Sequence, residues 1–296
     1  MTNLAFIGLG IMGAPMSVHL QRGGFAVTGY DLVPGATDRL VAAGGRAAGS
    51  LAEAVAEADV IALMVPDSPD VEAVLTGPAG VLALGRPGAL IIDFSTIRPD
   101  VTMALAEQAH QAGFRILDAP VSGGQPGAEQ ATLSIMVGGT AADFAAGRPV
   151  FELVGRTIVL VGPNGAGQTV KAANQLIVAA NIEALAEALV FLEAYGVDLT
   201  AAIEVLGGGL AGSAVLNQKA AKMVARDFQP GFRIDLHHKD MGIVTAAARQ
   251  AGLALPLGAL VAQLVAAVKA QGDGQLDHSA LFQGVQRLCG LPPTTD

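Results

Sequence analysis

Hydrophobic and polar positions follow two patterns in the first half of the chain. Short apolar runs recur along it, and segments with apolar residues three and four positions apart lie between most of them. The short runs predict strands, over residues 4–7, 26–30, 60–65, 89–93, 115–117, 133–137 and 158–160. The spaced segments predict helices, for example over residues 11–21, 51–58 and 101–112. This alternation predicts βαβ units on a mostly parallel sheet, the doubly wound α/β fold of the Rossmann type.

The pattern changes after Gly167. Residues 169–194 are mostly helix formers with no glycine or proline, and the rest of the chain has the pattern of helices joined by glycine-rich turns such as residues 207–209. We therefore predict a Rossmann-type domain over residues 1–163 and an all-α domain over residues 164–296. The two are joined by a long interdomain helix, over about residues 165–195, which begins the second domain.

Charge and composition exclude several classes of function. The 296 residues include 17 Lys and Arg against 26 Asp and Glu, a formal charge of −9, with no basic run. Nucleic acid and anionic membranes bind clustered positive charge, so we expect neither as a partner. Two uncharged stretches, residues 1–21 and 250–268, are interrupted by glycine and proline, so we expect no signal peptide and no membrane span. A single cysteine, Cys289, without metal-binding spacings predicts a cytoplasmic, metal-free protein.

A glycine motif follows the first predicted strand and opens the first predicted helix. It has the form GxGxxG and consists of Gly8, Leu9, Gly10, Ile11, Met12 and Gly13. Glycines at these positions permit a tight turn and close approach of a pyrophosphate, while N–H groups at the helix start supply positive potential. The motif predicts a dinucleotide site, and an ordinary strand-to-helix turn is the alternative.

An acidic residue ends the second predicted strand, about 20 residues beyond the glycines. The carboxylate of Asp31 can accept hydrogen bonds from the hydroxyls of an adenosine ribose, whereas a 2′-phosphate would meet a like charge there. Asp31 therefore favours NAD as the cofactor. Arg39 on the following helix softens this discrimination, so NADP is not excluded. The alternative role for Asp31 is to cap the next turn.

Two further segments carry candidate chemistry. Ser122, Gly123 and Gly124 follow a predicted strand, and the N–H groups of such a turn can converge with the hydroxyl on a carboxylate; an ordinary loop is the alternative. Lys171 lies in the first turns of the long helix, with Asn174 and Gln175 three and four residues further on. An apolar cleft and the positive end of a helix both lower the pKa of a lysine toward the range useful for proton transfer. Lys171 is thus a candidate general acid, with a solvated helix lysine as the alternative.

Four stretches resemble, in order and spacing, the motifs of the β-hydroxyacid dehydrogenases. They are FIGLGIMGAPM at residues 6–16, DAPVSGGQPGAEQATLSIMVGG at 118–139, GAGQTVKAANQ at 165–175 and FRIDLHHKD at 232–240. The resemblance covers nearly the whole chain and implies an NAD(P)-dependent oxidoreductase that acts on CH–OH groups. Other stretches are similar to the branch that reduces 2-hydroxy-3-oxopropionate (tartronate semialdehyde) to glycerate. They lie at residues 173–183, 208–213, 230–236 and 277–281.

The resemblance implies roles for the matched residues. Lys171 is implied as the general acid, and Ser122, Gly123 and Gly124 as the cradle of the substrate carboxylate. The residues implied to lie at the nucleotide or cofactor are Val65, Pro66, Thr96 and Lys239.

Two positions depart from the family pattern. Ala131 stands where glycine is usual, and Gln175 stands where a second asparagine is usual, although the tartronate-type branch shares this glutamine. Either Asn174 or Gln175 is therefore expected to orient the substrate.

Other functions stay open. Within the same chemistry, a 3-hydroxyisobutyrate dehydrogenase or another short-chain β-hydroxyacid dehydrogenase is the alternative, and a non-catalytic NAD-binding protein is the alternative of another class. The apolar helices predict a homodimer or homotetramer. His237 and His238 are adjacent, but neighbours on a helix point about 100° apart, so we expect no metal site there. The remaining histidines, His19, His110 and His278, are expected to be isolated.

Overall fold

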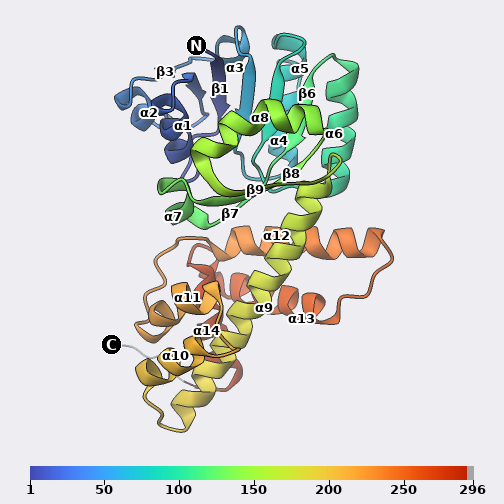
Figure 1. Cartoon of the computed structure of the whole chain (residues 1–296). Coiled ribbons are helices and arrows are strands. Elements are labelled where there is room, and N and C mark those ends of the chain that lie inside the picture. The colour runs from blue at the N-terminus through green and yellow to red at the C-terminus, as the bar shows by residue number, and fades with distance from the viewer. Residues whose placement is uncertain (292–296) are drawn as a thin grey trace. The chain divides into compact units, whose positions relative to one another are not determined.

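The structure is a computed structural model that describes residues 1–291 of the chain. The chain divides into two compact units, Met1–Lys171 and the residues from Ala172 onward, each with its own hydrophobic core (Figure 1). A Rossmann-like mixed sheet in the first unit is followed by a helical unit, so the expected fold class is confirmed. The domain boundary expected at residues 163 and 164 stays a prediction.

A nine-stranded sheet forms the first unit. Its strands are β1 (Asn3–Ile7), β2 (Ala26–Tyr30), β3 (Arg46–Ala47), β4 (Val60–Leu63), β5 (Leu90–Asp93), β6 (Arg115–Asp118), β7 (Val121–Ser122), β8 (Leu133–Gly138) and β9 (Gly155–Gly162). The strand order is β3-β2-β1-β4-β5-β6-β8-β7, and β9 also pairs with β8. The strands from β1 to β6 pair in parallel, whereas β8 runs antiparallel to β6 and β7. The order reverses between β1 and β4, which is where open α/β sheets bind ligands.

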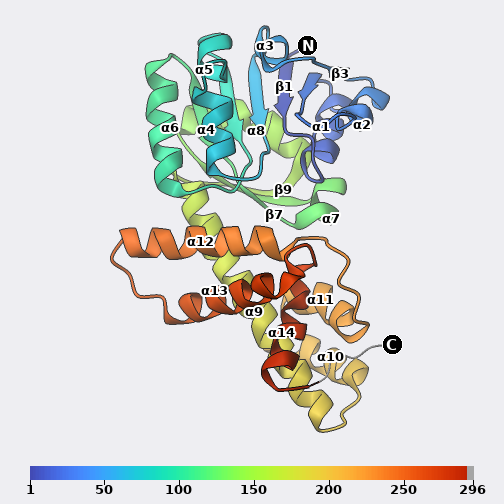
Figure 2. The same cartoon turned by 180° about the vertical axis from the view of Figure 1, so that it is seen from behind.

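Helices cover both faces of this sheet (Figures 1 and 2). Successive strand residues face opposite sides, so Leu4 and Phe6 belong to one core cluster and Ala5 and Ile7 to the other. The first cluster is closed by α1 (Gly13–Arg22), α2 (Asp38–Ala42), α7 (Gly124–Glu129) and α8 (Ala141–Val154). The second is closed by α3 (Leu51–Val55), α4 (Ser68–Thr76), α5 (Val81–Leu84) and α6 (Pro99–Gln111). Burial on both faces explains why these strands are continuous apolar runs.

The strands expected from the sequence are all present, with ends within three residues of those observed. Two strands were missed, β3 and β7, and each has only two residues. A two-residue strand is too short to show periodicity, so its position depends on the neighbouring strand rather than on its own sequence.

The second unit is a set of packed helices. It contains most of α9 (Ala166–Ala194), followed by α10 (Leu199–Gly208), α11 (Ala214–Val224), α12 (Ile234–Gln250), α13 (Pro256–Val268) and α14 (Leu281–Leu288). A π-helical turn (Lys269–Asp273) and a 3₁₀ turn (His278–Ala280) connect α13 to α14, and α12 and α13 lie side by side (Figure 2). The long helix expected at the start of the helical part is therefore confirmed.

α9 is the one helix of the described chain that is long and apolar enough to cross a membrane, by length and composition only. Its apolar residues have another explanation. Ala179, Ile182, Ala186 and Leu189 are fully buried in the core of the helical unit. We therefore interpret α9 as a core helix.

The same helix carries an acid into this core. Glu183 is 6% exposed, and its Oε2 has no hydrogen-bond partner among the described residues. It lines a cavity of about 40 Å³ whose other walls include Val268, Leu281 and Val285. Burial, and second to it the nearby Glu187 carboxylate, raise the pKa of the Glu183 carboxyl from 4.5 to about 7.

We expect Glu183→Gln to change how stability depends on pH. From pH 4.5 to about 7, the folded chain binds more protons at Glu183 than the unfolded chain does, so the free energy of unfolding falls as pH rises. Glutamine cannot ionise, so the variant should gain stability over the wild type at about pH 8 and less at about pH 5. Urea unfolding at both pH values measures this difference. The exposed Glu204→Gln is the control, and equal pH dependence of Glu183→Gln and wild type would contradict the burial argument.

Candidate active site

The glycine motif lies at the carboxyl end of β1, beside the point where the strand order reverses. Gly8 and Gly13 are required by the protein's own backbone, whereas Gly10 is not. Gly8 has a φ of +89°, and a Cβ on it would collide with the carbonyl oxygen of Met64; a Cβ on Gly13 would collide with the carbonyl oxygen of Gly8. Gly10 has no protein atom within 4 Å of a built Cβ. The space beside Gly10 is therefore open to a ligand, as close approach of a pyrophosphate requires.

The other motif residues surround this turn. Leu9 is buried, Ile11 is exposed, and Met12 is the helical residue that precedes α1. Because α1 begins directly after the glycine turn, its first N–H groups lie at the end of β1. The residues present fit the pyrophosphate of a dinucleotide.

Asp31 follows β2 and holds the glycine turn from the side. Its Oδ2 accepts a hydrogen bond from the Leu9 N–H at 2.6 Å, and its Oδ1 accepts one from the Val33 N–H at 2.7 Å. Asp31 therefore does close the next turn, which was the alternative role considered for it. A carboxylate has about four lone-pair sites, so these two bonds leave acceptor capacity for ribose hydroxyls. Arg39 pairs with Glu129, with 3.8 Å between Nη1 and Oε1.

The segments that follow β4 and β5 are connected by a hydrogen bond. Val65 donates its N–H to the Ser95 hydroxyl at 3.0 Å, and Ser95 donates its own N–H to Asp93 at 2.9 Å. Pro66 and Thr96, also expected at the nucleotide, are the next residues of these two segments. Both segments leave the carboxyl edge of the sheet, as the glycine turn does.

A buried carboxylate at the end of β6 holds the start of α9. Oδ1 of Asp118 accepts the Gly165 N–H at 2.8 Å, and Oδ2 accepts the Gln168 N–H at 3.1 Å. These donors belong to the N–H groups that a helix leaves without a partner at its start. Burial raises the pKa of the Asp118 carboxyl above its ordinary value, against the opposing effect of the N–H groups of Gly165 and Gln168.

The side chain of Gln168 makes a second attachment. Its Oε1 accepts the Ile97 N–H at 3.1 Å, and its Nε2 donates to the Ser95 carbonyl at 2.7 Å. The first turn of α9 is thus fixed to the ends of two neighbouring strands, β5 and β6. Neither Asp118 nor Gln168 was singled out from the sequence, although both lie in the motifs quoted above.

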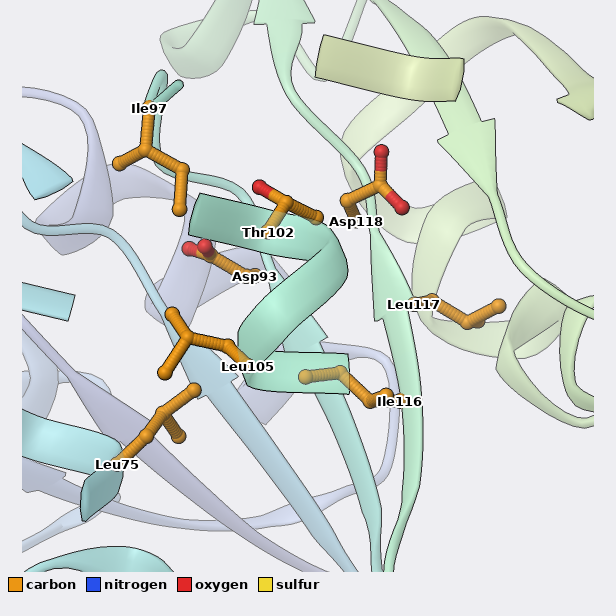
Figure 3. A pocket seen from close by; sticks show the side chains of 8 residues that line it. All are labelled: Leu75, Asp93, Ile97, Thr102, Leu105, Ile116, Leu117 and Asp118. Carbon is orange, nitrogen blue, oxygen red and sulfur yellow. The ribbon is translucent and has the colours of Figure 1, made fainter. Parts of the chain in front are cut away.

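Close packing leaves little space around Asp118. A Cβ on Gly138 would contact its carboxylate, and a Cβ on Gly167 would meet both this carboxylate and the carbonyl oxygen of Met136. Asp118 and Asp93, on neighbouring strands, are among the residues that line a cavity of only about 10 Å³ (Figure 3). A cavity of this size holds about one water molecule at most, so it is not a substrate site.

Lys171 lies three residues after Gln168 on α9 and is buried, with 6% of its surface exposed. The alternative of a solvated helix lysine is therefore wrong. Asn174 and Gln175 occupy the next turn, so the three side chains share one side of the helix.

The expected carboxylate cradle forms a distorted turn. Ser122 ends β7, and the two glycines that follow have φ values of +136° for Gly123 and +61° for Gly124. Both lie in the left-handed region, which favours glycine. Ala131, where the family usually has glycine, also has a left-handed φ of +55°. That departure from the family pattern thus places a Cβ on a backbone conformation that disfavours one.

In the helical unit, three polar side chains follow one another. Asn174 donates from Nδ2 to Oε1 of Gln175 at 2.8 Å, and Gln175 donates from Nε2 to Oδ2 of Asp240 at 2.5 Å. The other oxygen of Asp240 lies 3.0 Å from Nζ of Lys239. Asp240 is 2% exposed and was missed from the sequence, although it directly follows Lys239 in the fourth motif. A carboxylate adjacent to a candidate lysine was the available signal.

The histidines are arranged differently from the expectation. His278 is not isolated, because its Nδ1 lies 3.2 Å from Nδ1 of His237, and the ring of Phe232 packs against both. His238 does not take part in this pair. Among residues 1–291, no group of three or more His, Cys, Asp or Glu side chains is arranged to hold a metal ion.

Comparisons with known proteins agree with this arrangement. Residues 3–162 match the family model of the NAD binding domain of 6-phosphogluconate dehydrogenase. Residues 165–285 match the model described as NAD-binding of NADP-dependent 3-hydroxyisobutyrate dehydrogenase.

Similar proteins cover nearly the whole chain. A 2-hydroxy-3-oxopropionate reductase from Escherichia coli (strain K12) is 44% identical over 96% of this chain and 97% of its own length. A 3-hydroxyisobutyrate dehydrogenase from Pseudomonas aeruginosa is 37% identical over 97% of this chain and 98% of its own length. The solved structure of Mycobacterium tuberculosis 3-hydroxyisobutyrate dehydrogenase with L-serine matches with a TM-score of 0.88 and 37% identity. That match covers 97% of this chain and 99% of that one.

Two of the motif glycines predict different outcomes for the same substitution. Gly10→Ala should leave the free energy of unfolding unchanged to within about 1 kcal/mol, because its Cβ meets no protein atom. It should weaken NADH binding by roughly tenfold or more, because the methyl group occupies the open space. Gly13→Ala should destabilise the fold by about 1–3 kcal/mol through the clash with Gly8. Thermal unfolding measures the change in stability, and NADH titration measures the change in affinity. A Gly10→Ala variant that binds NADH like the wild type would contradict the assignment of the glycine turn as the pyrophosphate site.

Proposed function

This chain belongs to the 3-hydroxyisobutyrate dehydrogenase-like family of β-hydroxyacid dehydrogenases, and from this premise we propose that it reduces 2-hydroxy-3-oxopropionate to glycerate. It is an NAD(P)-dependent oxidoreductase. The observation that carries the proposed reaction is the buried Lys171, one turn beyond the anchored start of α9, with Asn174 in the following turn. The 44% identity with a 2-hydroxy-3-oxopropionate reductase supports the choice of substrate.

Lys171 acts as the general acid. When bound, reduced nicotinamide supplies a hydride to the aldehyde carbon of the substrate. Negative charge then grows on the aldehyde oxygen, and the ammonium of Lys171 donates a proton to it, so that C=O becomes CH–OH. Proton donation of this kind typically contributes about 10²–10⁴ in rate. Burial of the ammonium group strengthens its interaction with the growing charge, because little water competes for it.

Ser122, Gly123 and Gly124 bind the substrate carboxylate. Both glycines have positive φ values, and we propose that the backbone N–H groups of this turn converge with the Ser122 hydroxyl on the carboxylate. Holding the carboxylate fixes the orientation of the carbonyl, which is the second large contribution to the rate.

A polar amide selects the hydroxyl on the second carbon of the substrate. Asn174 offers hydrogen-bonding groups where a 3-hydroxyisobutyrate-type substrate has only a methyl group. A site built to hydrogen-bond a hydroxyl discriminates strongly against substrates that lack it, because its polar groups are then left unpaired. Asn174 therefore favours 2-hydroxy-3-oxopropionate over methylmalonate semialdehyde, the substrate of the alternative 3-hydroxyisobutyrate dehydrogenase activity.

NAD is the proposed cofactor. Asp31 places a carboxylate where the 2′-phosphate of NADP would need a cation, and Arg39 is paired with Glu129. Lys239 is proposed to lie near the cofactor.

The proposed state is a cytoplasmic homodimer or homotetramer. The helical unit exposes large apolar side chains, among them Ile177, Phe191 and Tyr195 on or beside α9 and Leu257 and Leu260 on α13. Exposed apolar groups of this size are typical of subunit contacts.

Steady-state assays with tartronate, malonate and methylmalonate semialdehydes test the proposed reaction. We expect the highest kcat/KM with tartronate semialdehyde, and Lys171→Ala should lower kcat with it by roughly 10² or more. NADH affinity should change little in the variant, because the lost interaction forms only as charge develops. Lys222→Ala on α11, which pairs with Asp227, is the matched control and should behave like the wild type. Near wild-type turnover of Lys171→Ala would end the general-acid assignment, and preference for methylmalonate semialdehyde would favour the alternative substrate.

Cofactor preference is tested separately. The wild type should have a lower KM for NADH than for NADPH, and Asp31→Asn should narrow that difference by removing the negative charge. Both cofactors are assayed with the same substrate and at the same enzyme concentration. Equal KM values for NADH and NADPH in the wild type would remove Asp31 from this role.

A further inference from the structure

Gln175 is already engaged at both ends of its side chain. Its Nε2 donates to Asp240 at 2.5 Å, its Oε1 accepts from Asn174 at 2.8 Å, and the residue is 5% exposed. A side chain held in this way is poorly placed to take a hydrogen bond from a substrate as well. Of the two candidates in this turn, Asn174 is the half-buried one and lies closer to Lys171 in the sequence.

The carboxylate of Asp240 determines which way both amides face. An ionised carboxylate only accepts hydrogen bonds, so the NH₂ end of Gln175 must face it and the carbonyl end must face away. That carbonyl is an acceptor, so Asn174 in turn must direct its NH₂ group toward Gln175. The carbonyl oxygen of Asn174 is therefore left to accept a hydrogen bond from another group.

Lys239 keeps this arrangement electrostatically balanced. Its ammonium lies 3.0 Å from Oδ1 of Asp240, an ion pair without hydrogen-bond geometry, and Asp240 is 2% exposed. A buried carboxylate is costly unless a positive charge compensates it. Lys239 and Asp240 together thus form a compensated pair whose second oxygen is directed at Gln175.

We infer that Asp240 is a positioning residue that acts through Gln175 to present the carbonyl oxygen of Asn174 to the substrate, where it accepts a hydrogen bond from the 2-hydroxyl. A hydroxyl group can donate this bond, whereas a hydrogen atom or a methyl group at the same carbon cannot. Asp240 therefore determines substrate selectivity without touching the substrate. Because the substrate is the one proposed above, the role of Asp240 rests on the proposed function.

Exchanging the donor and the acceptor of the hydrogen bond between Gln175 and Asp240 tests whether this contact determines selectivity. In the Asp240→Asn variant, the amide at position 240 can donate as well as accept, so Gln175 is free to turn either end of its side chain toward it. In the Gln175→Glu variant, two carboxylates face each other. Each single variant should lower the ratio of kcat/KM for tartronate semialdehyde over malonate semialdehyde by roughly tenfold or more. In the double variant, the carboxylate introduced at position 175 can accept from the amide introduced at position 240 and still accept from Asn174, so most of the selectivity should return.

The measured quantity is this selectivity ratio, because a general loss of structure lowers both kcat/KM values and leaves their ratio unchanged. Gln175→Met is a second single variant that leaves the Lys239–Asp240 pair in place and should lose the selectivity to a similar extent. Asp235→Asn removes a carboxylate from the first turn of the same helix, α12, and should keep the wild-type ratio. NADH affinity and thermal unfolding are followed for every variant.

The possible results separate the two proposals. A selective wild type whose single variants keep its ratio would overturn the role of Asp240 and leave the proposed function intact. A double variant whose loss equals the product of the two single losses would also overturn the direct contact. A wild type with no preference for tartronate semialdehyde would overturn the proposed substrate and, with it, selection by Asn174.

Discussion

The structure around Lys171 depends on one carboxylate that binds the start of a helix. Asp118 ends β6 and accepts hydrogen bonds from Gly165 and Gln168, so it takes the place of a capping side chain for α9. Without it, buried N–H groups at the helix start would lack partners. Because a helix is rigid over one turn, fixing Gln168 also fixes the Cα of Lys171 three residues later. The position of Lys171, the proposed general acid, therefore depends on an interaction that does not involve the substrate.

The carboxyl edge of the parallel strands brings the separate parts of the first unit together. The glycine turn follows β1, the Val65 segment follows β4, the Ser95 segment follows β5, and Asp118 ends β6. Ser95 and Gln168 connect the last three of these through hydrogen bonds. The same sheet edge thus positions both the dinucleotide turn and the helix that carries the proposed acid.

The sequence predicted the helices and strands whose buried apolar residues repeat at a regular period. It did not predict elements whose position depends on pairing with a distant part of the chain. β1, β2 and α9 were predicted because each presents apolar residues at its own period. β3 and β7, with two residues each, form only by pairing with a neighbour. The glycines and Lys171 were likewise visible, because a turn or a lone charge in an apolar segment is a local signal.

Asp118, Gln168 and Asp240 were not singled out for a related reason. The hydrogen-bond partners that define their roles lie 47 or more residues away in the sequence, and no local pattern records such a contact. By contrast, the ion pair of Asp240 with the adjacent Lys239 is local. His278 shows the same effect, since its partner His237 is 41 residues away. The residues proposed to contact a ligand directly could thus be identified from motifs. The residues that hold them could be recognised only once the fold had brought buried polar groups together.

The Asp118 carboxylate holds the helix start that positions Lys171. Single-turnover measurement of NADH oxidation by the Asp118→Asn variant, at saturating NADH and tartronate semialdehyde, tests this dependence. The amide offers only one acceptor oxygen in place of two, so α9 loses a charge-assisted bond at its start. We expect the rate of hydride transfer to fall by roughly tenfold or more, with NADH affinity close to that of the wild type. An Asp118→Asn variant that transfers hydride at the wild-type rate would contradict it.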